Sequence, residues 1–447
     1  MKVGLSTVAL WVALLLGVHI LLADWQNQTP YPSDRRRVNR PGFAPRAPTK
    51  NTALCQGLPR PRDMNNSSQN VTRVLFMTYS RAGASMVGQL FDKDLNTTYW
   101  SEPVDGILSD LYGTYHGWHP LDVFTNQEGL PRRVPHCEDE SIVQHLSSLL
   151  ACDLNEIPID ILTATDAILP TWKTKFYMPC LRQMLVDVKP HNNPTGYSAN
   201  VALACKELIV QHCPKTFSYS QQALYNCFDK IQDLKGKMQF FLFFEYGKCI
   251  ASVTHYSKKC LPLFKKECTS SDMIVVKSSR LRGEQVARLM HEHQNLKVVY
   301  LVRDPRGIAL SREKMGSLSG VSQDNYVNEA ALLCQRMHYD LTHLEILKHR
   351  YPNRIIRLTY EEFLQNPGQS GTNVYSFLEK EMSSKVKGWL DFKMDQLKEE
   401  GPLGEVTLKN MTSMSFKWRR QMPSSDNDYI IRKCSHVLSA LGYPLLK

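Results

Sequence analysis

The pattern of hydrophobic and polar positions divides the chain into three parts. Residues 3–23 form an uncharged apolar run behind Lys2. Roughly 20 such residues cross a bilayer as a helix, so the run predicts a signal-anchor transmembrane helix with residues 1–2 as its tail; a cleaved signal peptide is the alternative. Residues 24–70 are polar and rich in Pro, Arg and Asn, which predicts an extended stem. The remaining residues, 71–447, carry the periodic patterns of a folded domain.

Short apolar runs alternate with helical patterns in this domain. Val74–Tyr79 is typical of a buried strand, and an apolar-periodic helix is expected from Ser85 to Phe91 after a tight loop. Strands separated by helical crossovers indicate an α/β fold with a mainly parallel sheet flanked by helices on both faces. The other expected strands are Met273–Lys277, Leu296–Val302 and Arg354–Tyr360, and the other expected helices are Gly283–His293 and one that begins near Ile308.

Two further helices are predicted in the C-terminal half. One has apolar residues at steps of three and four, which is typical of a stripe facing the core. The other, TYEEFLQNP, has Thr359 as a candidate N-cap and Pro367 as its stop. The residues of the apolar stripe are Ala330, Leu333, Met337, Leu341 and Leu344.

The segment 116–270 is rich in cysteine and resists division into elements. It predicts an insertion in the α/β body that is stapled by disulfides. Zinc binding, for instance at His212 and Cys213, is the weaker alternative because the segment has no CxxC pair. Its nine cysteines are Cys137, Cys152, Cys180, Cys205, Cys213, Cys227, Cys249, Cys260 and Cys268.

Composition bears on the compartment and on the kind of partner. The hydrophobic share of 43% and the charged share of 22% indicate a globular protein. The net charge of +11 favours an anionic partner, but eight basic against three acidic residues lie between Asp24 and Met64, so no large basic field suited to nucleic acid remains. Six Asn-x-Ser/Thr sequons beside the apolar run predict that the long C-terminal part is lumenal. They begin at Asn27, Asn65, Asn66, Asn70, Asn96 and Asn410.

The first candidate loop, SRAGASM, follows the strand Val74–Tyr79. Parallel sheets bind ligands at the carboxyl ends of their strands. Backbone N–H groups of this turn and the Arg81 guanidinium are suited to a phosphate, although a purely structural turn is the alternative. Gly83 is followed by Ala84 instead of a Walker Lys, which disfavours a P-loop kinase.

The second candidate loop, RDPRG, follows the strand Leu296–Val302. Arg303 at the strand end and Ser311 two turns into the next helix are placed to share one phosphate. The alternative is that Asp304 caps this helix, Pro305 occupies its first turn and the arginines are solvated. Two such loops in this order, each after an apolar strand, favour a nucleotide site.

These residues resemble a known family. YSRAGASMVGQLF with the later SEP, and LKVVYLVRDPRGIALSRE, are similar to the two nucleotide-binding motifs of the Golgi carbohydrate sulfotransferases, above all the galactose/N-acetylgalactosamine/N-acetylglucosamine 6-O-sulfotransferase group of chondroitin and keratan sulfate type. The resemblance covers about residues 71–115 and 272–447, with FKWR and LGY in the tail. It implies a P-loop-like fold in a type II Golgi membrane protein, with 3′-phosphoadenosine-5′-phosphosulfate (PAPS) as co-substrate, a glycosaminoglycan or glycoprotein glycan as acceptor, and no metal.

The resemblance also implies a role for each matched residue. Arg81 stabilises the leaving phosphate oxygen, and Glu102 is the general base. Arg303 and Ser311 hold the 3′-phosphate. The cofactor-binding set that it implies is Ser80, Arg81, Ala82, Gly83, Ala84, Ser85, Met86, Arg303, Asp304, Arg306 and Ser311.

Several alternatives remain open at this point. The family usually has hydroxyl residues where this chain has Ala82 and Ala84, and each lost hydrogen bond is worth about 0.5–1.5 kcal/mol, so a glycan-binding protein on the same fold that no longer transfers sulfate is the second hypothesis. Lys277 and Arg280 are placed either to contact donor or glycan or to be solvated. A homo-oligomer is also open. Candidates to stack on a sugar face, with burial in the core as the commoner alternative, are Trp118, Trp172 and Trp418. Alternative bases ranked below Glu102 are His116, His119 and His136.

Overall fold

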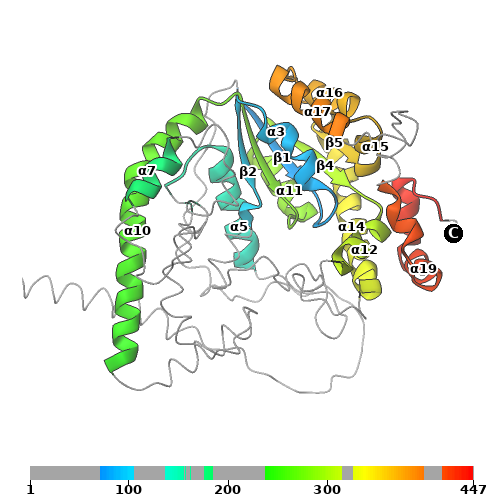
Figure 1. The fold of residues 1–447 in the computed structure, drawn as a ribbon, viewed down its shortest axis with the longest axis horizontal. Helices are drawn as coiled ribbons and strands as arrows, with labels where there is room; N and C mark the ends of the chain where they lie inside the picture. Colours follow the sequence, from blue (N-terminus) through cyan, green and yellow to red (C-terminus); the bar gives the residue numbers. More distant parts are fainter. Residues whose placement is uncertain are drawn as a thin grey trace, which may run out of the picture. The chain divides into compact units, whose positions relative to one another are not determined.

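A five-stranded parallel sheet is the centre of the protein (Figure 1). The computed structural model describes residues 71–104, 136–155, 157, 162, 176–184, 237–314, 326–396 and 415–445. The strands lie in the order β2-β3-β1-β4-β5, and every neighbouring pair is parallel. The four strands whose bounds the sequence predicted are confirmed, with ends shifted by two residues at most: β1 Thr72–Met77, β3 Met273–Ser278, β4 Leu296–Val302 and β5 Ile355–Thr359. The fifth strand is β2, Thr97–Ser101.

Successive side chains of the central strand β1 enter two different hydrophobic clusters. Leu75 and Met77 belong to one cluster, whereas Val74 and Phe76 belong to the other. This is the period of two that a strand imposes, and it shows that both faces of the sheet are buried. The near-continuous apolar runs of the sequence are therefore explained by burial on both sides.

Helices cover both faces, as predicted. The cluster of Leu75 contains residues of α5 (His136–Leu150), α7 (Tyr177–Met184), α10 (Lys237–Thr269), α11 (Gly283–Glu292), α12 (Pro305–Glu313), α14 (Tyr326–Arg350), the 3₁₀ turn η5 (Lys417–Arg420) and α19 (Ser424–Leu441). The cluster of Val74 contains residues of α2 (Ala84–Val87), α3 (Gln89–Asp92), α15 (Tyr360–Gln365), α16 (Pro367–Phe377) and α17 (Ser384–Gln396).

Two helix expectations are refined by the structure. The helix expected from Ser85 to Phe91 consists of two short helices, α2 and α3, that meet at Gly88. A Cβ on Gly88 would lie 2.2 Å from the Tyr99 hydroxyl, so this position has room for no side chain. Thr359 caps α15 as predicted, and Pro367 stands at the first turn of the next helix, α16, so α15 ends before it.

The apolar stripe of α14 is confirmed. All five of its predicted residues are buried in the cluster that also contains α19. A disulfide between Cys334 and Cys434 joins these two helices. The C-terminal helix is thereby held against the body of the domain by packing and by a covalent bond.

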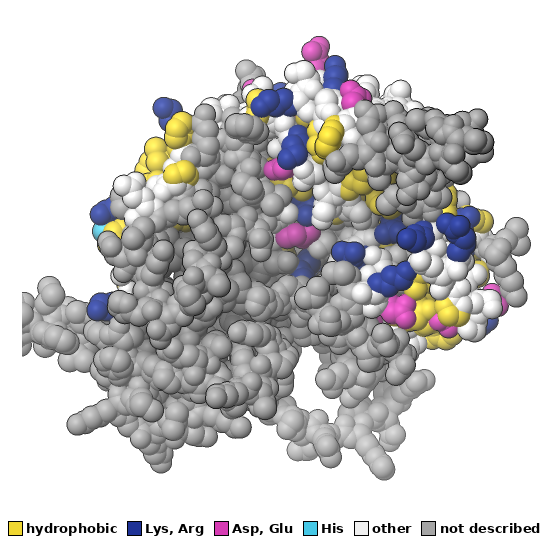
Figure 2. Space-filling model, in the orientation of Figure 1, with side chains coloured by type: hydrophobic (Ala, Val, Ile, Leu, Met, Phe, Trp, Pro, Cys, Tyr) yellow, Lys and Arg dark blue, Asp and Glu magenta, His cyan; other side chains and the backbone are white. Residues whose placement is uncertain are grey.

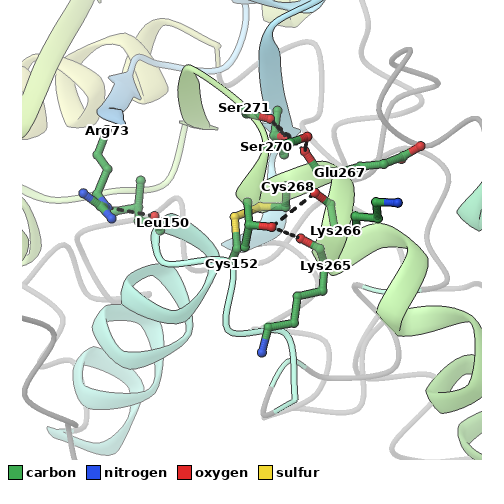
Figure 3. Close-up of a disulfide and its surroundings, with 11 residues drawn as sticks. Arg73, Leu150, Cys152, Lys265, Lys266, Glu267, Cys268, Ser270 and Ser271 are labelled. Atoms are coloured by element: carbon green, nitrogen blue, oxygen red, sulfur yellow. Dashed lines mark hydrogen bonds between the residues drawn. A yellow bond between two sulfur atoms is a disulfide. The ribbon is translucent and has the colours of Figure 1, made fainter. Parts of the chain in front are cut away.

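Disulfides also staple the described part of the segment 116–270. Cys180 in α7 pairs with Cys260 in α10, and Cys152 pairs with Cys268 at the end of α10 (Figure 3). Arg73 donates from Nε to the carbonyl oxygen of Leu150 at 3.0 Å, which ties β1 to the last residue of α5. The predicted disulfides are thus confirmed for these pairs, while His212 and Cys213 lie outside the described residues.

In the part of the chain that the structure describes, no helix combines the length and apolar character of a membrane span. The predicted anchor at residues 3–23 and the predicted stem at residues 24–70 lie outside that part.

Candidate active site

The candidate site lies at the carboxyl ends of the strands, beside the point where their order reverses. The chain passes from β1 outward to β2 and returns through β3, then continues on the other side of β1 with β4 and β5. Crevices at such reversals are the usual ligand sites of open α/β sheets. Because β1 pairs with β4, the two candidate loops that follow these strands are neighbours.

The loop after β1, residues 80–83, turns through left-handed backbone conformations. Arg81 has a φ of 72° and Gly83 a φ of 90°. A Cβ on Gly83 would lie 2.2 Å from the Tyr360 ring, so glycine is required there both by conformation and by space. The N–H of Ala82 donates to the carbonyl oxygen of Tyr79 at 3.0 Å and closes the turn. Turns of this kind, followed by the first N–H groups of a helix, form anion-binding concavities.

The side chains of this loop divide between core and surface. Ala82 and Ala84 are buried in the two hydrophobic clusters. Arg81 and Ser85 are exposed, whereas Ser80 and Met86 are half-buried. The two alanines therefore point into the protein, and the exposed edge of the loop consists of its backbone, Arg81 and Ser85.

Arg303, at the end of β4, reaches across to this loop. Its Nη1 donates to the carbonyl oxygen of Arg81 at 3.0 Å, and its guanidinium lies 4.8 Å from the centre of the Tyr360 ring. Burial raises the pKa of Tyr360, while Arg303 and Arg81 oppose this shift, so the ring is neutral at physiological pH. A Cβ on Gly307 would lie 2.9 Å from the Trp418 ring and 3.2 Å from Arg303 Nε, so glycine leaves room for both side chains.

Helix α12 brings two more polar side chains to the loop. Arg81 Nε donates to Ser311 Oγ at 3.1 Å, and Arg312 Nε donates to the carbonyl oxygen of Ser80 at 3.3 Å. Three guanidinium groups, those of Arg81, Arg303 and Arg312, thus converge on one short loop. Figure 2 shows Lys and Arg side chains gathered over the region where Figure 1 places α12. Like charges held this close favour an anion between them.

The structure gives Asp304 and Arg306 internal partners. Asp304 caps α12 by accepting from the N–H of Arg306, and Pro305 lies in the first turn, as the structural alternative had predicted. The Arg306 side chain pairs with Asp304 at 2.8 Å, and the two are 2% and 0% exposed. Arg306 also lies 4.7 Å from the centre of the Trp418 ring. Both residues therefore position the loop of Arg303 through the core, and their side chains do not converge with those of Arg81 and Ser311.

Glu102 stands immediately after β2 with a φ of 58°. Its Oε2 accepts from the N–H of Ser279 at 2.9 Å and from the Ser279 hydroxyl at 3.1 Å. Its Oε1 lies 3.5 Å from Lys277 Nζ, and the carboxylate is 23% exposed, whereas the lysine is buried. Two hydrogen bonds thus fix Oε2 and the lysine charge lies beside Oε1, while part of the carboxylate stays open to solvent.

The other residues that the sequence suggested for the site either have a different location in the structure or lie outside the described residues. Trp418 is buried in the core beside Arg306. Lys277 is buried against Glu102 from β3, and Arg280 lies in the loop that follows this strand. His136 is the first residue of α5. The candidates outside the described residues are Trp118, Trp172, His116 and His119.

Comparison with known proteins agrees with this geometry. The sulfotransferase domain model matches residues 71–441, so the chain belongs to the sulfotransferase family, and the resemblance drawn from the sequence is confirmed. Carbohydrate sulfotransferase 1 of Rattus norvegicus is 22% identical over 84% of this chain and 80% of that protein. Carbohydrate sulfotransferase 3 of Mus musculus is 24% identical over 43% of this chain and 44% of that protein.

Solved structures give a weaker likeness. A sulfotransferase from Mycobacterium avium, STF9, matches with 12% identity and a TM-score of 0.36, over 86% of this chain and 79% of that one. At that TM-score the likeness carries no argument about function.

Three residues of the site carried no recognisable sequence signal. Tyr360 lies under Arg303 from the start of α15, and Ser279 holds Glu102 from the loop after β3. Arg312 was visible only as a neighbour of Ser311. Each of these residues contacts a residue far away in the chain, so no local motif predicts its role in the site.

Proposed function

We propose that this sulfotransferase moves the sulfuryl group of PAPS to a hydroxyl group of a sugar. The observation that carries the proposal is the convergence of Arg81, Arg303 and Ser311 between the loops after β1 and β4. A nucleotide with phosphates at both its 5′ and 3′ ends is recognised by two cationic loops side by side. The relatives named above, which are carbohydrate sulfotransferases, support a sugar as the acceptor.

The donor binds through both loops. The backbone of residues 80–85 and the Arg81 guanidinium hold the 5′-phosphosulfate, while Arg303 and Ser311 hold the 3′-phosphate. As the bond between sulfur and the bridging oxygen breaks, negative charge builds on the phosphate that leaves. Arg81 is placed at the start of the loop to stabilise this charge, and such electrostatic terms dominate group transfers of this kind.

Glu102 accepts the proton of the attacking sugar hydroxyl. The new bond forms between that oxygen and sulfur, the proton passes to the carboxylate, and adenosine 3′,5′-bisphosphate (PAP) leaves. Ser279 and Lys277 hold the carboxylate in one orientation, and this fixes the base for attack. Lys277 therefore acts on the base, which is neither the donor or glycan contact nor the solvated position that the sequence left open.

The burial of Ala82 and Ala84 favours the enzyme over a glycan-binding protein that has lost transfer. Both side chains enter hydrophobic clusters, where a hydroxyl group would face apolar atoms. The exposed edge of the loop keeps Arg81, Ser85 and the backbone. Alanine instead of a hydroxyl residue at these two positions therefore costs the donor site few hydrogen-bond donors.

The finer features of the proposal concern the acceptor and the compartment. The acceptor is the 6-hydroxyl of galactose, N-acetylgalactosamine or N-acetylglucosamine in a glycosaminoglycan or glycoprotein glycan, and the chain is a type II Golgi membrane protein with a lumenal catalytic domain. The disulfides support an oxidising compartment. Asn96, which heads a sequon, is exposed in the loop before β2.

Two experiments test these features. Incubation of the full chain with labelled PAPS and desulfated glycans, followed by disaccharide mapping, should give 6-O-sulfated products; sulfate at another position would refute the 6-O assignment. When the chain is produced in cells of the secretory pathway, glycosidase treatment should lower its mass by the mass of its N-linked glycans. The Asn96→Gln variant should lose one glycan less than the wild type. An unglycosylated chain in cells would contradict the lumenal placement.

A further inference from the structure

Helix α14 carries a buried pair of opposite charges behind the active site. Arg336 Nε lies 3.6 Å from Asp340 Oδ2, and the side chains are 3% and 0% exposed. A charged pair inside a protein brings little net stability, because removal of both charges from water costs about as much as their attraction returns. The contacts of these two residues indicate what the pair does instead.

Asp340 is bonded to the residue that precedes the donor loop. Its Oδ2 accepts from the Tyr79 hydroxyl at 3.0 Å, and the Tyr79 and Tyr300 hydroxyl oxygens are 2.6 Å apart. Tyr79 also accepts, through its carbonyl oxygen, the N–H of Ala82 that closes the turn. Asp340 therefore anchors the first residue of the turn that carries Arg81.

Arg336 is bonded to the loop that holds the general base. Its Nη2 donates to the carbonyl oxygens of Ser279 at 2.8 Å and of Leu281 at 3.0 Å. Ser279 in turn donates both its N–H and its hydroxyl to Glu102. The Arg336 guanidinium also lies 5.1 Å from the centre of the Tyr79 ring, so the same side chain contacts the loop after β3 and the residue before the Arg81 loop.

We propose that Arg336 and Asp340 form a positioning unit that sets the Arg81 loop and Glu102 in one geometry for sulfuryl transfer, an inference that rests on the function proposed above. The two loops follow different strands and are not adjacent in sequence. A rigid pair one helical turn apart joins them through Tyr79 on one side and Ser279 on the other. The pair touches neither substrate directly and acts through these two residues.

The test compares Arg336→Met with a matched control, Arg354→Met. Arg354 also donates to backbone carbonyl oxygens, those of Leu296, Met290 and His293, but at the amino end of β4, away from the site. Both variants of the full chain should lose stability. Only Arg336→Met should lower kcat, by about 100-fold for a displacement near 1 Å, and it should raise the Kd for PAP more than Arg354→Met does, because the unit also sets the Arg81 loop.

A double-mutant cycle shows whether Arg336 acts through the base. In a Glu102→Gln background, Arg336→Met should lower kcat by a smaller factor than it does in the wild-type background, since Glu102 is already disabled and only the effect on the Arg81 loop remains. Where Arg336→Met fails to fold, the isosteric Asp340→Asn takes its place, and a smaller loss of kcat is expected.

The outcomes are distinct. A kcat for Arg336→Met equal to that of Arg354→Met, or losses that multiply fully with Glu102→Gln, would overturn the positioning unit while the proposed function stands. A wild-type chain that transfers no sulfate would overturn the proposed function and this inference together.

Discussion

Arg81 donates a hydrogen bond from Nε to Ser311 Oγ at 3.1 Å, although 230 positions separate the two residues in the chain. The bond joins the loop after β1 to the helix after β4. It also aligns a residue assigned to the 5′ end of the donor with one assigned to the 3′-phosphate. The two nucleotide motifs of the sequence are thus one continuous surface in the folded protein.

Removal of the Ser311 hydroxyl should weaken donor binding without unfolding the protein. Ser311→Ala deletes a partner of Arg81 and the hydrogen bond that we propose to the 3′-phosphate, which is worth about 1.5 kcal/mol or roughly a tenfold rise in the Kd for PAP. Calorimetric titration with PAP measures this change. Ser425→Ala, which removes an exposed hydroxyl in the first turn of α19, is the control and should bind as the wild type does. An unchanged Kd for Ser311→Ala would contradict the assignment of this residue.

A side chain at position 83 should disable the donor loop. Gly83→Ala places a Cβ 2.2 Å from the Tyr360 ring at a φ of 90°, so the loop or the ring must shift. Because Tyr360 also supports Arg303, we expect PAP binding to be lost in calorimetry. The matched control is Gly388→Ala in α17, where a Cβ would meet nothing within 4 Å and the helix should gain up to about 1 kcal/mol. Normal PAP binding by Gly83→Ala would show that the loop does not need its left-handed turn.

The fold was largely predictable because burial leaves a local signature. Strand β4 has the predicted bounds, since a run of seven residues in which only Lys297 is not apolar, between polar turns, admits few other interpretations. Thr359 as the cap of α15 follows from the same kind of local pattern. For the candidate site, the sequence indicated residues only where a motif contains its own chemistry, as with Arg81, Arg303 and Ser311, which the structure brings together.

The remaining features depend on contacts between distant residues. Arg306 is a positive residue in a nucleotide motif, yet its charge is paired with Asp304 inside the protein. Tyr79 was predicted as the last residue of a strand, and the neighbouring sequence does not predict its hydrogen bond to Asp340. Such pairings arise from the packing of α12 and α14 against the sheet, which no periodicity in one segment can show.

Acidification should destabilise the protein through His293. This buried side chain lies beside Arg73 and Arg354, and burial together with these two cations lowers its pKa from 6.5 to about 4. Between those values the unfolded chain binds a proton that the folded chain does not. The free energy of unfolding should therefore fall as pH drops from 6.5 towards 4, by at most about 3 kcal/mol.

Thermal unfolding between pH 7 and pH 4.5 measures this effect. The Tm of His293→Gln should fall less over that range than the Tm of the wild type. His291→Gln, at an exposed position near the end of α11 and two residues before His293, should follow the wild type. Parallel Tm curves for His293→Gln and the wild type would remove His293 as the source of acid sensitivity.

Loss of the Cys334–Cys434 disulfide should destabilise the C-terminal helix. The bond closes a loop with a sequence separation of 100 residues, and crosslinks over such loops contribute about 2–5 kcal/mol. A double substitution to alanine should lower the Tm clearly, and reduction of the wild type should reproduce part of that loss. A Tm equal to that of the untreated wild type would show that helix packing alone holds α19 in place.

The central claim is that the two arginine loops bind a sulfate donor for transfer to sugar. Its most direct test is transfer of labelled sulfate from PAPS to a desulfated glycan by the full chain, with Arg81→Ala and Arg303→Ala beside the wild type. We predict transfer by the wild type and its near-complete loss in both variants, while their thermal stability changes little because both side chains are at least partly exposed. Transfer that persists unchanged in either variant, or that is absent from the wild type, would contradict the account.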